Sequence, residues 1–138
     1  MFVEWRPEYA SGNGDIDAMH RLIVDRLACV GRAVQEGRGA ASAFRDLRGA
    51  VLDHFDAEDR LLELMGAAAS AGHRREHGHL ARLLADGQAL CEDHGRAAAV
   101  PTFVDVVGRW LIHEITANDR HLVTFLAARD RARQQADF

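Results

Sequence analysis

"FRDLRGAVLDHFDAEDRLLELM", residues 44–65, is the stretch of the sequence that best indicates the fold. Its apolar residues recur every three or four positions, which predicts an amphipathic α-helix. His54 and Glu58 fall on the same face as these apolar residues, and their spacing of four places them on one side of the helix. Ionisable groups on a buried face are destabilising unless they find partners. The stretch therefore predicts a helix that presents polar groups to the inside of an apolar core.

Three other segments have the same helical periodicity. The first covers residues 16–34 and stops before Gly37. The third begins at His73, after the sequence "GAAASAG" (66–72), which is predicted to be a connection. The fourth opens at Pro101, a residue that is well tolerated in the first turn of a helix.

These segments predict an all-α fold, an antiparallel up-down-up-down four-helix bundle with short links. The expected organisation is a single domain of 138 residues. It comprises an irregular N-terminal arm over residues 1–15, the bundle over residues 16–130 and a C-terminal tail over residues 131–138. No strand-like alternation or internal repeat is apparent.

Composition narrows the classes of function. The net charge of −4 gives no support for binding nucleic acid, which usually needs a basic face. Cys29 and Cys91 are too few for a disulfide framework, and we interpret them as buried free thiols. Neither a signal peptide nor an apolar stretch long enough for a membrane span is recognised. A soluble, cytoplasmic protein is expected.

Every predicted helix carries ionisable groups within its apolar face. The first has His20, the second His54 and Glu58, and the third His73 and His77. Imidazoles and carboxylates that arrive together from several helices can share a metal cluster, and bundle cores are where such sites are built. The remaining histidines lack this placement and are expected at the surface: His79, His94, His113 and His121.

An alternative interpretation concerns "HRREH" (His73–His77), which fits the inverted zinc-protease signature H-x-x-E-H. Glu76 would then be the general base. The motif is short, and a chain of this size leaves little room for a substrate cleft. This interpretation also leaves His20, His54 and Glu58 unexplained.

The fourth helix contains "WLIHEITAND" (110–119), in which His113 and Glu114 compete as the inward residue. Successive residues of an α-helix advance by about 100°. On that count Glu114 and Asp119 flank the apolar face, whereas His113 points toward solvent. The candidate metal ligands from all four helices are then four histidines and three carboxylates. This mixture of nitrogen and oxygen ligands suits iron better than a metal that prefers thiolates.

The sequence at this point resembles the hemerythrin family, in particular its bacterial single-domain members, over nearly the whole chain. Trp5 and "IDAMH" (16–20) are similar to the family's arm and first ligand segment. "HFDAE" (54–58) resembles its H-F-x-x-E motif and "HRREH" its H-x-x-x-H motif. "WLIHEITAND" resembles W-L-x-x-H-I-x-x-x-D, with Glu114 at the position of the family's histidine.

The resemblance implies two iron ions with an oxo or hydroxo bridge. One iron would be held by His20 and His54, and the other by His73, His77 and the residue at position 114. Glu58 and Asp119 would bridge the two. In the family, O2 binds at the iron that has two terminal histidines. The expected pocket-lining residues are Trp5, Phe55, Trp110, Leu111 and Ile115, for which ordinary core packing is an equal alternative.

Other departures from the family pattern are Leu122, where a tyrosine is often found, and the absence of Gly-Tyr-Pro after the second helix. The Glu114 carboxylate adds negative charge, which stabilises the ferric state, so faster autoxidation is expected. The first functional hypothesis is an O2-binding protein for storage, delivery or sensing. The alternatives are a diiron enzyme that reduces O2 or peroxide or oxidises ferrous iron, an iron- or redox-responsive regulatory module, and a purely structural bundle. Manganese or a mixed iron–manganese pair also suits these ligands.

Overall fold

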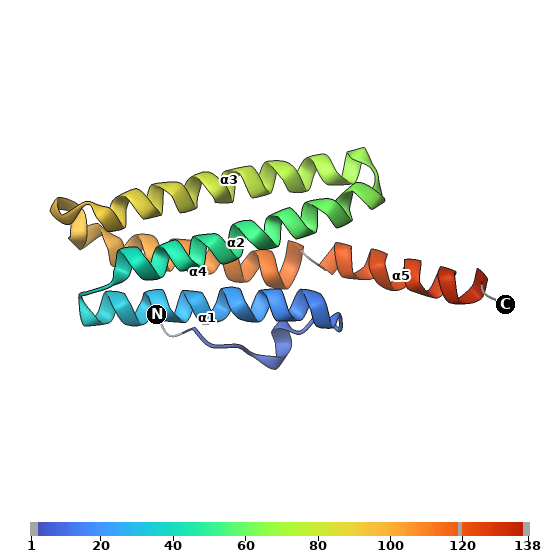
Figure 1. Cartoon of the computed structure of the whole chain (residues 1–138), viewed down its shortest axis with the longest axis horizontal. Coiled ribbons are helices and arrows are strands. Elements are labelled where there is room, and N and C mark those ends of the chain that lie inside the picture. The colour runs from blue at the N-terminus through green and yellow to red at the C-terminus, as the bar shows by residue number, and fades with distance from the viewer. Residues whose placement is uncertain (1–2, 119, 137–138) are drawn as a thin grey trace.

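The computed structural model describes residues 3–118 and 120–136, and these residues form helices and short connections without a strand. The long helices are α1 (Gly14–Glu36), α2 (Ala40–Leu62), α3 (Ala67–Glu92), α4 (Val100–His113) and α5 (Arg120–Ala136). Shorter turns are the 3₁₀ helices η1 (Pro7–Tyr9), η2 (Glu63–Met65) and η3 (His94–Ala99) and the π-helix η4 (Glu114–Asn118). Helices α1 to α4 lie side by side in Figure 1. The chain is therefore all-helical and consistent with a four-helix bundle.

The ends of α1 follow from local chemistry. The side chain of Asn13 accepts hydrogen bonds from the backbone N–H groups of Asp15 and Ile16, both at 3.1 Å. These are two of the donors that the first turn of a helix leaves without a partner in the helix. At the other end Gly37 adopts the left-handed conformation, with φ of 72°, and closes the helix. The turn into α2 is consequently short.

The connection between α2 and α3 is shorter than the sequence predicts. Residues 66–72 were expected to form a link, but α3 begins at Ala67 and only Gly66, with φ of 101°, stands outside it. Alanine is the best helix former, so the alanine-rich segment extends the helix instead of interrupting it. The prediction of a connection here is wrong.

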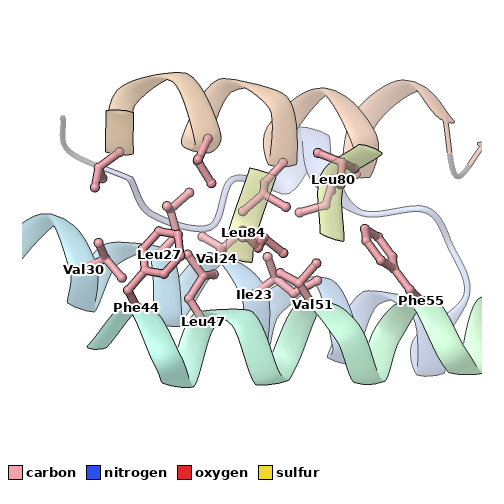
Figure 2. Close-up of a cluster of buried hydrophobic side chains, with 14 of the residues drawn as sticks. Ile23, Val24, Leu27, Val30, Phe44, Leu47, Val51, Phe55, Leu80 and Leu84 are labelled. Atoms are coloured by element: carbon pink, nitrogen blue, oxygen red, sulfur yellow. The ribbon is translucent and has the colours of Figure 1, made fainter. Parts of the chain in front are cut away.

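The core runs along the inside of the bundle, with side chains from α1, α2, α3 and α4 (Figure 2). Phe44, Leu47 and Val51 from α2 face Val24 and Leu27 from α1 within it. A second, smaller group consists of Ile16, Leu62 and Leu122, and we call it the end cluster. Because His20 and Glu58 lie between these two groups along α1 and α2, apolar residues flank the polar residues on both sides.

The fourth segment is not one continuous α-helix. Residues 114–118 are wound as a π-helix, in which hydrogen bonds join residues five apart. An α-helical advance was predicted throughout this segment, and that prediction is wrong from Glu114 onward. Beyond it, α5 reaches past the ends of the other helices in Figure 1 and continues to Ala136, into the segment predicted as a tail.

The N-terminal arm is tied to the first turn of α1. Ser11 donates two hydrogen bonds to the Asp17 carboxylate, from its backbone N–H at 2.8 Å and from its hydroxyl at 2.7 Å. Farther along the arm, η1 packs against η4. The arm thus links the start of α1 to the π-helix. Among the described residues, no helix has the length and apolar character that crossing a membrane requires.

Candidate metal centre

Five ionisable side chains from four elements are buried together between the core and the end cluster. His20 comes from α1, His54 and Glu58 from α2, His77 from α3 and Glu114 from η4, and each is at most 5% exposed. His73, one turn before His77, has 18% of its side chain exposed. Groups of this kind are buried only where they are paired or bind a metal. The helices predicted to bring ionisable groups to the core therefore do so.

Glu58 lies at the middle of this group. Its Oε2 is 2.9 Å from Nε2 of His54. Its Oε1 is 3.3 Å from Nδ1 of His73 and 3.6 Å from Nε2 of His77. The ring of His20 meets the ring of His54 edge to face, with centroids 4.8 Å apart. One carboxylate oxygen thus faces the His20–His54 pair and the other faces the His73–His77 pair.

Glu114 enters the group from η4. It is 3% exposed, and its Oε1 is 3.5 Å from Nε2 of His77. The adjacent His113 is exposed at the surface. The structure thus agrees with the predicted orientation of both residues, because α4 is regular up to His113 and the helical count holds to that point.

His77 has two contacts that were not predicted from the sequence, one at the Nδ1 edge of its ring and one on a ring face. Its Nδ1 lies 2.9 Å from Oδ1 of Asp59, a half-buried residue next to Glu58. Its ring stacks on Phe55 with centroids 4.0 Å apart and planes 8° from parallel. In the neutral ring that a metal would require, a hydrogen bond donated by Nδ1 leaves Nε2 as the ligand atom. Asp59 was not predicted as a partner of His77, because it lies off the apolar face of α2. Its position beside Glu58 is the one feature of the sequence that indicates this role.

The carboxylates shift the protonation of both α3 histidines. The hydrogen bond with Glu58 raises the pKa of His73 above its ordinary value, against the opposing effect of burial. Burial lowers the pKa of His77, but its hydrogen bonds with Glu114 and Glu58 and the charges of Glu58 and Asp59 outweigh this and raise the pKa to about 10. Without a metal, these protons offset part of the negative charge of the carboxylates. A cation bound at the same place would displace them.

The donor set fits a metal ion. One ligand atom from each of Glu58, His73, His77 and Glu114 lies within 4.8 Å of the other three. Two imidazole nitrogens and two carboxylate oxygens are donors that iron and manganese accept. Glu76, the general base of the zinc-protease interpretation, is not one of these four residues. The cluster thus draws its carboxylates from α2 and η4 instead of from the "HRREH" motif.

The other residues predicted at the site fall into three groups. Phe55, Leu111 and Ile115 are buried in the core. Trp5 is half-buried on the arm, edge to face with Tyr9, whereas Trp110 is 47% exposed and does not wall a buried pocket. Asp119 lies outside the described residues, so its assignment as a ligand stays a prediction.

The next question is whether the histidines expected at the surface are exposed. His79 and His94, like His113, are exposed. The side chain of His121 lies outside the part of the chain that the structure describes. The described histidines thus divide between the buried group and the surface as the apolar periodicity predicts.

Comparison with known proteins finds a matching family. The sequence model of the family described as Hemerythrin, "Hemerythrin HHE cation binding domain", matches residues 11–126. That range includes all the residues of the buried cluster and also Asp59 and Asp119. No curated protein matches the chain significantly.

Proposed function

Because the chain belongs to the hemerythrin HHE cation-binding family, we propose that it is a non-heme diiron protein that binds O2 inside an up-down-up-down four-helix bundle. The observation that carries the proposal is the meeting of four ligand atoms from α2, α3 and η4 within 4.8 Å of one another. A metal ion satisfies two buried carboxylates and two imidazoles at once. In an apolar core without a metal, burial of these carboxylates and imidazoles would cost free energy.

The proposed division of ligands follows the two faces of Glu58. His20 and His54, which lie toward Oε2, would hold one iron. His73, His77 and Glu114, which lie toward Oε1, would hold the other. The contacts of Glu58 with His54 at 2.9 Å and with His73 at 3.3 Å support a bridging role for this carboxylate. Asp119 is proposed as the second bridge.

The chemistry divides between the metal pair and the protein. A bound iron pair would supply the electrons that O2 takes up. The chain holds the ligand geometry, since Phe55 stacks on His77 and Asp59 accepts a hydrogen bond from its Nδ1. The core on one side and the end cluster on the other exclude bulk water, which strengthens electrostatic interactions within the site.

Glu114 distinguishes this site from one with five histidines. Two ferrous ions, one hydroxide and two carboxylates sum to about +1, and a third carboxylate brings the total to about zero. Added negative charge stabilises the ferric state. We therefore expect the reduced protein to autoxidise faster than its Glu114→His variant.

The experiment combines metal analysis with oxidation kinetics. Iron content near two per chain and oxo-bridge absorption after exposure to air would support the proposal. The reduced protein and its Glu114→His variant are then mixed with O2, and the loss of the ferrous state is followed by absorbance. A colourless, metal-free, stable protein would refute the diiron site. Slower oxidation of the wild type than of the variant would refute the role given to Glu114.

A second candidate function is a diiron enzyme that reduces O2 or peroxide or oxidises ferrous iron. The buried Glu114 favours it, because two histidines and one carboxylate form the ligand set of many oxygen-activating iron enzymes. Repeated turnover with peroxide or with added ferrous iron would favour the enzyme. A single stoichiometric oxidation would favour the O2-binding protein.

A further inference from the structure

The outer side of the π-helix carries a groove that the proposed metal centre does not use. It has a volume of about 400 Å³, within the range of small-molecule sites. The arm forms one wall with Arg6 and Tyr9, and α4 forms the other with Arg109 and Ile112. His113 extends the α4 wall to the edge of η4. The groove therefore lies between two segments that are far apart in the sequence.

The charge of the groove is positive although the whole chain is acidic. Its lining includes two arginines against a single carboxylate, that of Glu4. The chain as a whole has a net charge of −4. Among the residues that the structure describes, no carboxylate forms an ion pair with Arg6 or Arg109, whereas Arg45 and Arg74 are paired with Glu92 and Glu63. Arg6 and Arg109 are both exposed and line the groove, so an anion in the groove can reach either guanidinium.

Apolar surface lies beside these charges. The ring of Tyr9 and the side chain of Ile112 line the same groove. Tyr9 is held in place by its edge-to-face contact with Trp5, whose ring in turn lies under the guanidinium of Arg21 at 4.9 Å. A ligand that suits both kinds of lining has an anionic head and a compact apolar body. Guanidinium groups are well matched to carboxylates, which they bind through two parallel hydrogen bonds.

We propose that this groove is a binding site for a small organic carboxylate, with Arg6 and Arg109 binding the carboxylate group and Tyr9 and Ile112 contacting the apolar body. The site is separate from the buried cluster, because Glu114 points into the core whereas the neighbouring His113 lines the groove. The proposal does not depend on which metal the protein holds.

The test uses the purified full-length protein and benzoate as the probe. Benzamide, which has nearly the same shape and no charge, is the matched control ligand, and inorganic phosphate is an anion without an apolar body. Isothermal titration calorimetry is expected to show benzoate binding more tightly than either control. Equal affinities for benzoate and benzamide, or tighter binding of phosphate, would overturn the proposal.

Variants test whether benzoate binds in this groove. Arg109→Ala and Arg6→Ala are each expected to weaken benzoate binding by about tenfold or more, because a hydrogen bond to a charged group is lost. Arg131→Ala removes the same charge from an exposed position on α5 and should leave the affinity unchanged. Circular dichroism verifies that each variant is folded. If Arg131→Ala weakens binding as much as Arg109→Ala, the effect is one of overall charge and the groove assignment is wrong.

Discussion

Replacement of Asp59 by alanine is the sharpest test of how the protein supports its proposed metal ligands. The Asp59 carboxylate lies 2.9 Å from Nδ1 of His77, and Nε2 of the same ring faces Glu58 and Glu114. Loss of such an outer partner typically reduces metal affinity by about 10- to 100-fold. That range corresponds to about 1.4–2.8 kcal/mol.

Two features of the structure place the expected loss of metal affinity at the lower end of this range. The side chain of Asp59 is 31% exposed, so water replaces part of the lost hydrogen bond. The charge of Asp59 also helps to raise the pKa of His77, so its removal weakens the competition of the proton with the metal. We therefore expect Asp59→Ala to lower the metal affinity about tenfold at neutral pH. Asp59→Asn retains an acceptor oxygen and should fall between this variant and the wild type.

The assay is a titration of metal-free protein with Co²⁺ against a competing chelator, because cobalt is stable in air and its visible absorption reports coordination. Asp56→Asn is the matched control, since Asp56 is an exposed carboxylate on the same helix. Circular dichroism of the metal-free variants verifies that they are folded. If Asp59→Ala and Asp56→Asn bind Co²⁺ with affinities within a factor of about two, far below the expected loss, Asp59 does not support His77.

Three further predictions concern stability in urea. The pKa of His77 is about 10 in the folded protein against an ordinary value of 6.5. The protonated ring should therefore stabilise the metal-free protein fully below pH 6.5, and this stabilisation should be lost as the pH rises through 10. A urea midpoint that does not change with pH between 6.5 and 10 would contradict this prediction. Asn13→Ala removes the cap of α1 and should lower the unfolding free energy by about 1 kcal/mol, whereas Asn13→Asp should be nearly neutral. Gly87→Ala would place Cβ 2.4 Å from Cζ of Phe44 and should destabilise by about 1–3 kcal/mol. Gly49→Ala, with no atom within 4 Å, should stabilise by roughly 0.5–1 kcal/mol, and equal effects of the two substitutions would refute the packing argument.

Helical periodicity predicted the inner faces of the bundle well. His54 and Glu58 are buried beside Phe55, as their spacing within the apolar face required. His113 and Glu114 were separated correctly because α4 is a regular α-helix up to that point. Periodicity succeeds here because burial of apolar side chains fixes the rotation of each helix about its axis.

The same reasoning failed where local backbone geometry or contacts off the apolar face decide the structure. A π-turn adds a residue to one turn of a helix and leaves no mark in the apolar pattern, so η4 was missed. Trp110 was expected to line the pocket or to pack in the core but is 47% exposed. Asp59 contacts His77 across the interface of α2 and α3, and such a pairing depends on the offset of the two helices along their axes.

The π-helix also connects the winding of the backbone at the candidate metal centre with the orientation of the C-terminal helix. Each residue of an α-helix turns the chain by about 100°, so loss of the extra residue in η4 would turn everything that follows by about that angle. The part of α5 that projects beyond the bundle in Figure 1 would turn by the same angle. Glu114 is the first residue of this π-helix. Leu122 near the start of α5 is buried with Ile16 and Leu62, so such a turn would also move this side chain out of the end cluster.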